Sequence, residues 1–136
     1  MWLAHIARSK NARNMSLVII GSEAGVMGVP GSTEYSTCKS AIQYGLMLSL
    51  APEARDLTGP ENLARVNTIG PGAVNTPQFD MWCAESSTAM WVDSEATVAY
   101  RRPVEMEDVA RTCLMLASDR WSASINGQVV RVNGRR

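Results

Sequence analysis

Ser16-Leu-Val-Ile-Ile20, followed by the glycine-rich stretch Gly21-Ser-Glu-Ala-Gly-Val-Met-Gly28, decides the fold class of this chain. Residues 17–20 are apolar, are mostly β-branched and do not alternate with polar residues. Such a run is typical of a strand that helices cover on both faces of a parallel sheet. The four glycines and Pro30 within residues 21–31 then indicate a loop at the end of that strand.

Further helices and strands are predicted outward from this segment. Helical spacing of apolar residues indicates helices at 1–9, 32–55 and 105–118. Short apolar runs predict strands at 65–69 and 128–132. Pro52 predicts a kink or an early end of the second helix, because proline lacks the N–H that an α-helix uses. The order α-β-α-β-α-β predicts an α/β fold with a parallel sheet of about three strands, flanked by helices and joined by right-handed crossovers.

Length and charge narrow the possible classes of protein. The chain has 136 residues, 13 Lys+Arg, 13 Asp+Glu, 46% apolar residues and 3 Cys. This length suits one domain, so residues 1–136 are treated as a single unit. The balanced charge argues against nucleic acid as a partner, and no apolar run approaches the ~20 residues that span a membrane. The cysteines lack disulfide or metal-ligand spacing, so no metal site is expected and a reducing compartment, the cytoplasm, is predicted.

Segment 21–39 contains the first candidate catalytic or binding residues. Residues 21–28 have the composition of a phosphate-binding loop, but such a loop ends inside a helix, and Val29-Pro30-Gly31 cannot continue one. A flexible loop with Ser22 at its entrance is the better interpretation. Tyr35 and Lys39 lie four residues apart in the following helix, which places both on one face. An ammonium near a phenol favours the phenolate and so makes proton exchange near neutral pH feasible.

These side chains are expected to meet at one edge of the sheet. Ser22 follows the first strand and precedes Tyr35 by 13 residues, while the Pro71-Gly72 turn and Thr76 follow the second strand. Ligands of open α/β sheets bind at the carboxyl ends of the strands. One site can therefore gather all of these residues.

With Ser22, Tyr35, Lys39 and Pro71-Gly72 in this order and spacing, the sequence resembles the short-chain dehydrogenase/reductase family. Residues 125–134, Ile-Asn-Gly-Gln-Val-Val-Arg-Val-Asn-Gly, look like the last strand and closing tail of that family. The resemblance covers nearly the whole chain. It implies a partial Rossmann-like, doubly wound sheet and hydride transfer between a nicotinamide and a carbonyl or secondary alcohol.

Carried over residue by residue, the resemblance implies a Ser-Tyr-Lys site. Tyr35 exchanges a proton with the substrate oxygen, Ser22 holds that oxygen, and Lys39 favours the ionised tyrosine and binds the nicotinamide ribose. The implied cofactor-binding residues are Tyr35, Lys39, Pro71, Gly72, Val74 and Thr76. Residues 77–99 correspond to the variable substrate loop. Its large apolar side chains suit either a bulky apolar small-molecule substrate or a plain hydrophobic cover; they are Phe79, Met81, Trp82, Met90 and Trp91.

The sequence also departs from the family pattern. No glycine-rich pyrophosphate turn precedes Ser22, so the chain looks like the C-terminal half of a member, a truncated domain without the adenosine-binding half. Weak affinity for NAD or NADP is expected, and nothing discriminates between the two. The strand at 16–20 is interior in the family, so here it is expected to present an apolar edge that invites a partner chain. Apolar residues all around the long helix after Ala41 also favour a homo-oligomer.

Two alternatives to an oxidoreductase stay open. The first is a catalytically silent chain that acts as a binding or partner subunit, because the pyrophosphate loop is missing. The second is a cofactor-independent isomerase or cyclase that uses Tyr35 for proton transfer. Hydride transfer by the chain alone argues against the first alternative, and turnover without a nicotinamide favours the second.

Overall fold

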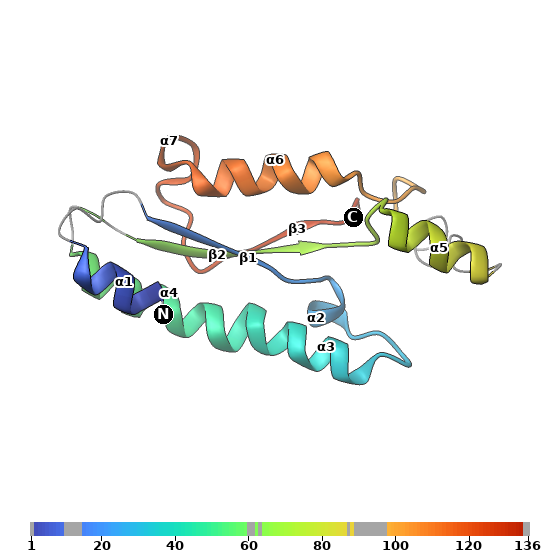
Figure 1. Ribbon diagram of the computed structural model, residues 1–136, viewed down its shortest axis with the longest axis horizontal. Helices are drawn as coiled ribbons and strands as arrows, with labels where there is room; N and C mark the ends of the chain where they lie inside the picture. The colour runs from blue at the N-terminus through green and yellow to red at the C-terminus, as the bar shows by residue number, and fades with distance from the viewer. Residues whose placement is uncertain are drawn as a thin grey trace.

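The computed structural model describes residues 2–9, 15–59, 62, 64–86, 88 and 98–134. Helices lie on both sides of one sheet, with α1, α3 and α4 against one face and α6 against the other (Figure 1). Among the described residues, no helix is both long and apolar enough to cross a membrane. The elements, in chain order, are α1 (Trp2–Arg8), β1 (Ser16–Ile20), α2 (Ala24–Met27), α3 (Thr33–Ser40), η1 (Ala41–Leu46), α4 (Met47–Thr58), β2 (Arg65–Pro71), α5 (Pro77–Glu85), α6 (Met106–Ala117), α7 (Asp119–Ser122) and β3 (Val129–Val132).

The sheet has three parallel strands in the order β1-β2-β3, which confirms the predicted α/β fold with its parallel sheet. Ser16 pairs with Arg65 at one end of β1 and Ile20 pairs with Ile69 at the other. Every residue of the central strand β2 is buried. Because β2 has neighbours on both sides and helices on both faces, its backbone and side chains are shielded from water.

Two buried polar residues of β2, Arg65 and Asn67, form hydrogen bonds with the segment that leads into β3. The Asn67 amide donates to the Ile125 carbonyl at 2.7 Å and accepts from the Gln128 N–H at 3.0 Å. The Arg65 guanidinium donates to the Leu116 carbonyl and to Ser122. These bonds offset the cost of removing polar groups from water and tie the strand to the segment that leads into β3.

The helix predicted at 32–55 is longer than expected and irregular in its middle. It runs from Thr33 to Thr58 as α3, the π-helical segment η1 and α4. The prediction that Pro52 ends it early is wrong, because α4 continues for six residues beyond that proline. Pro52 and Leu48 are both exposed, so water can solvate the carbonyl that lacks a donor.

Two segments interpreted as loops contain helices. Residues 24–27 form the single turn α2, and residues 77–85 form α5 at the start of the predicted substrate loop. The Thr76 hydroxyl accepts from the Phe79 N–H at 3.1 Å, and Pro77 occupies the first turn, so local capping accounts for α5. The remaining large side chains predicted for that loop, Met90 and Trp91, lie outside the described residues.

The main core lies between α1, α4 and β2. Ile6, Met47 and Val66 are almost completely buried there, together with alanines that let the helices approach. On the opposite side of the long helix, Leu46 and Leu48 are about half exposed. Strand β1 pairs only with β2 among the described residues, and Ile20 at its end is 49% exposed. The expected apolar edge is therefore present in this part of the chain.

Candidate functional site

The chain leaving β1 stays bonded to the end of β2. The Gly21 N–H donates to the Ile69 carbonyl at 2.7 Å, and the Glu23 N–H donates to the Pro71 carbonyl at 2.8 Å. Ser22 lies between these two bonds and is half buried. Its hydroxyl accepts from the Ala24 N–H at 3.1 Å, which helps to begin α2. Ser22 is thus located at the carboxyl edge of the sheet.

Lys39 lies at the same edge. Its ammonium Nζ donates to the Ile20 carbonyl at 3.0 Å and stands 5.7 Å from the centroid of the Tyr35 ring. Tyr35 is 51% exposed. A single bond to a carbonyl leaves two further donors on the ammonium. The structure therefore brings Lys39 to the strand end that precedes Ser22, with Tyr35 one helical turn away.

A close approach of α2 to α3 makes this arrangement possible. A Cβ on Gly25 would lie 2.7 Å from the carbonyl carbon of Lys39 and from the nitrogen of Ser40. Those are backbone atoms and cannot swing aside. The absence of a side chain at residue 25 therefore decides how closely Lys39 approaches the end of β1.

Gln43, one turn after Lys39, also reaches the end of β1. Its side chain is fully buried, and its Oε1 accepts a short hydrogen bond from the Ser22 N–H. The same side chain occupies the space that a Cβ on Gly21 would fill. Gln43 was not among the predicted site residues, although its four-residue spacing from Lys39 was a usable signal.

The residues predicted to contact a nicotinamide divide between two places. Pro71 is buried at the end of β2, and the Gly72 N–H donates to the Val132 carbonyl at 3.0 Å. Val74 forms an isolated bridge with Val104, and Thr76 begins α5. Pro71 is bonded to the residue after Ser22, whereas Val74 and Thr76 line a separate hollow beside α5.

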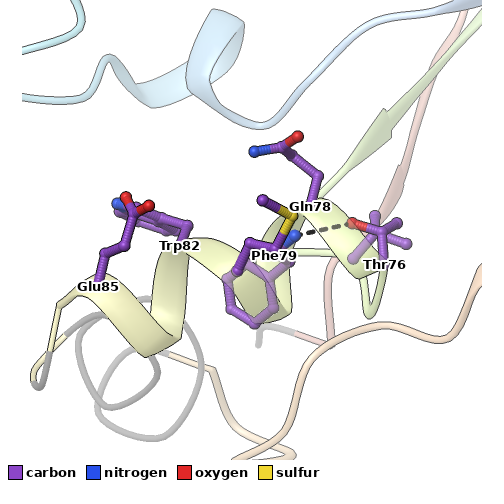
Figure 2. Close-up of a pocket in the computed structure, with 7 residues that line it drawn as sticks. Thr76, Gln78, Phe79, Trp82 and Glu85 are labelled. Atoms are coloured by element: carbon purple, nitrogen blue, oxygen red, sulfur yellow. Dashed lines mark hydrogen bonds between the residues drawn. The ribbon is translucent and has the colours of Figure 1, made fainter.

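That hollow has a volume of about 420 Å³. Phe79 and Trp82 meet edge to face, with ring centroids 5.9 Å apart and an interplanar angle of 62°. Gln78 and Glu85 add polar groups at the rim (Figure 2). The hollow thus offers apolar side chains and hydrogen-bonding groups together, the two kinds of contact that a small-molecule site uses.

Comparison with known proteins decides the family. A family profile described as "Enoyl-(Acyl carrier protein) reductase" matches residues 1–134. A 3-oxoacyl-[acyl-carrier-protein] reductase from Thermotoga maritima is 32% identical over 123 residues, which are 90% of this chain and 45% of the relative. The chain belongs to the short-chain dehydrogenase/reductase family. The resemblance seen in the Ser22, Tyr35 and Lys39 pattern is therefore confirmed at the level of the family.

Other members of this dehydrogenase/reductase family show the same relationship. An acetoacetyl-CoA reductase from Synechocystis is 32% identical over 88% of this chain and 45% of its own length. Sorbitol-6-phosphate 2-dehydrogenase from Erwinia amylovora shares the fold, with a TM-score of 0.77 over 92% of this chain and 49% of that structure, at 22% identity. A 3-hydroxyacyl-CoA dehydrogenase type-2 from Mycobacterium avium gives a TM-score of 0.72 and 28% identity over 97% of this chain and 47% of its own. The chain spans about half the length of these members.

Proposed function

We propose that this chain supplies the proton-transfer and carbonyl-binding side of an NAD(P)-dependent oxidoreductase, which interconverts a carbonyl and a secondary alcohol. One observation carries the proposal: the Lys39 ammonium stands beside the Tyr35 ring and donates a hydrogen bond to the carbonyl of Ile20. Ile20 is the last residue of β1 and precedes Ser22 by two residues. Names of relatives that contain "reductase" or "dehydrogenase" support the reaction class.

In the proposed mechanism Tyr35 and Ser22 act on one substrate oxygen, and Lys39 acts on Tyr35. The Tyr35 hydroxyl gives its proton to the carbonyl oxygen during reduction and takes it back during oxidation. The Ser22 hydroxyl donates a hydrogen bond to the same oxygen, where negative charge develops. The Lys39 ammonium, close to the Tyr35 ring, stabilises the phenolate that forms when the proton leaves.

The described residues fit the nicotinamide end of a cofactor. The apolar side chain of Val74 offers a surface for a ring. The Thr76 hydroxyl can still donate a hydrogen bond while it caps α5, and Lys39 has spare donors for a ribose. When bound, the nicotinamide supplies the hydride for the carbonyl carbon or accepts it from the alcohol. We propose NAD or NADP as the cofactor whose nicotinamide end these residues hold.

For the substrate we propose a small molecule with an apolar portion beside its carbonyl. The hollow lined by Val74, Phe79 and Trp82 supports this choice. Several relatives are named for 3-oxoacyl or 3-hydroxyacyl thioesters, so acetoacetyl-CoA is the first substrate to use. Its thioester arm suits the polar rim at Gln78 and Glu85.

Replacement of Tyr35 by phenylalanine tests the proposal directly. We expect Tyr35→Phe to lower kcat for acetoacetyl-CoA reduction by roughly 10²- to 10⁴-fold, because the proton donor is lost while the ring stays. Tyr44→Phe is the matched control, because Tyr44 lies on the same long helix, nine residues after Tyr35, and is 39% exposed. Equal turnover in Tyr35→Phe and wild type would exclude the assigned role.

Calorimetric titration with NADPH and with NADH tests the cofactor. Binding tighter than ~100 μM, equivalent to about 5 kcal/mol, would mean that the dinucleotide site is completed, for example by a second copy of the chain. Size exclusion of the same sample shows whether a second copy is present. Absence of binding to either nucleotide even at millimolar concentration, from a folded sample, would overturn the oxidoreductase proposal.

A second candidate function is a partner subunit without catalysis. The edge of β1, which pairs only with β2 among the described residues, favours it, because an open parallel edge can accept another strand. Such a subunit would assemble without nicotinamide. Turnover of acetoacetyl-CoA by the chain, lost in Tyr35→Phe, would eliminate it.

A further inference from the structure

Three residues of the long helix form a row directed at the end of β1. Tyr35, Lys39 and Gln43 follow one another at intervals of four, the spacing that places side chains on one helical face. Lys39 bonds the carbonyl of Ile20, and Gln43 bonds the N–H of Ser22. The helix therefore holds the strand end on both sides of Gly21.

The backbone around Gln43 is unusual. Residues 41–46 form a π-helical segment between two α-helical stretches, so the helix is wider where Gln43 leaves it. Short π-helical segments arise often at functional sites. Gly21 provides the matching space, because the Gln43 side chain fills the volume of a Cβ there.

The burial of Gln43 is energetically unfavourable in one respect. Its side chain is fully buried, yet its Nε2 finds no hydrogen-bond acceptor among the described residues. A buried amide donor without a partner destabilises the folded chain, and an apolar side chain of the same size would avoid that cost. The favourable contact of this amide is made by its oxygen, which accepts the hydrogen bond from the Ser22 N–H.

We propose that Gln43 is a positioning residue for Ser22. The Gln43 Oε1 accepts a hydrogen bond from the Ser22 N–H and so fixes the backbone that carries the Ser22 hydroxyl. Lys39 fixes the Ile20 carbonyl, two residues earlier. One helical face thereby sets the relative places of the serine, the lysine and the tyrosine. The catalytic part of this inference rests on the proposed function, whereas the contact itself does not.

A double-mutant cycle tests the catalytic part. Gln43→Met removes the acceptor and keeps the length of the side chain. We expect it to lower kcat for acetoacetyl-CoA about tenfold in the wild type, with little change in the KM for NADPH. In the Ser22→Ala background the same change should lower kcat less than twofold, because no hydroxyl remains to be positioned. An equal loss in both backgrounds would overturn the proposal, since it would show a general structural effect.

Nuclear magnetic resonance tests the contact without turnover. In the wild-type chain we expect a scalar coupling between the Ser22 amide nitrogen and the Gln43 side-chain carbonyl carbon, and this measurement needs no variant to fold. In Gln43→Met the Ser22 amide proton should move upfield and exchange faster with solvent. Absence of the coupling overturns the proposal. A chain with the coupling but no turnover in any variant refutes the proposed function and confirms that Gln43 holds Ser22.

Discussion

Gly25 brings two helices of the candidate site into contact, and Gly25→Ala should separate them. The added Cβ would lie 2.7 Å from two backbone atoms of α3, whereas ordinary contacts begin at 3.4 Å. Relief of the clash by rigid movement requires a shift of about 0.7 Å between α2 and α3. Because the Lys39 ammonium is 3.0 Å from the Ile20 carbonyl, a shift of that size is enough to break the bond between them.

Overpacking of this kind costs about 1 to 3 kcal/mol of unfolding free energy. The unfolding free energy of a small protein falls by about 2 kcal/mol per molar urea. A loss of about 2 kcal/mol therefore lowers the urea concentration at the unfolding midpoint by about 1 M. The loss of the Lys39 bond should also reduce the kcat for acetoacetyl-CoA, because the ammonium moves relative to the Tyr35 ring.

Urea unfolding followed by circular dichroism measures the effect, with Gly45→Ala as the matched control. Gly45 lies in the same long helix, is exposed, and has no atom within 4 Å of the position of an added Cβ. The control should stabilise the chain by about 0.5 to 1 kcal/mol, because glycine is a poor helix former. A midpoint for Gly25→Ala at or above that of the wild type would refute the packing argument.

Two further predictions concern stability. Asn67 is fully buried, and Asn67→Leu leaves the Ile125 carbonyl and the Gln128 N–H without their partner. We therefore expect the unfolding free energy measured in urea to fall by about 2 to 4 kcal/mol. Asn126→Leu is unsuitable as a control, because Asn126 also bonds β2. Exposed Asp80→Asn serves instead and should change stability by less than about 0.5 kcal/mol. Thr76→Ala removes the hydroxyl that caps α5 and should lower the unfolding free energy by about 1 kcal/mol. Thr76→Ser keeps a hydroxyl and should retain most of that stability. Equal melting temperatures for the wild type and both variants would contradict the capping assignment.

The strands were predictable because their signal is local. The apolar run 17–20 and the buried run from residue 65 onward mark β1 and β2 without any knowledge of the sheet. The spacing of Ser22, Tyr35 and Lys39 likewise indicated one site, since a parallel strand and the helix after it share an edge. The helix α5 was missed, although Thr76 and Pro77 form a recognisable start.

The long helix shows what local patterns leave out. Pro52 looked like its end, but the effect of a proline depends on whether the carbonyl one turn earlier faces water or protein. Glutamine is mostly exposed in proteins, so its residue type does not indicate that Gln43 is buried. Its burial depends on a π-helical segment and on Gly21 in another part of the chain.

The sequence by itself determined the α/β class, the family and the residue types available for proton transfer, because periodicity and motif spacing are properties of neighbouring residues. Only the tertiary structure decided which groups meet. It placed the Lys39 ammonium on the Ile20 carbonyl and the Gln43 side chain on the Ser22 N–H. Those contacts join residues far apart in the chain, and they depend on how closely helices pack onto strand ends, a distance of tenths of an ångström that no local pattern encodes.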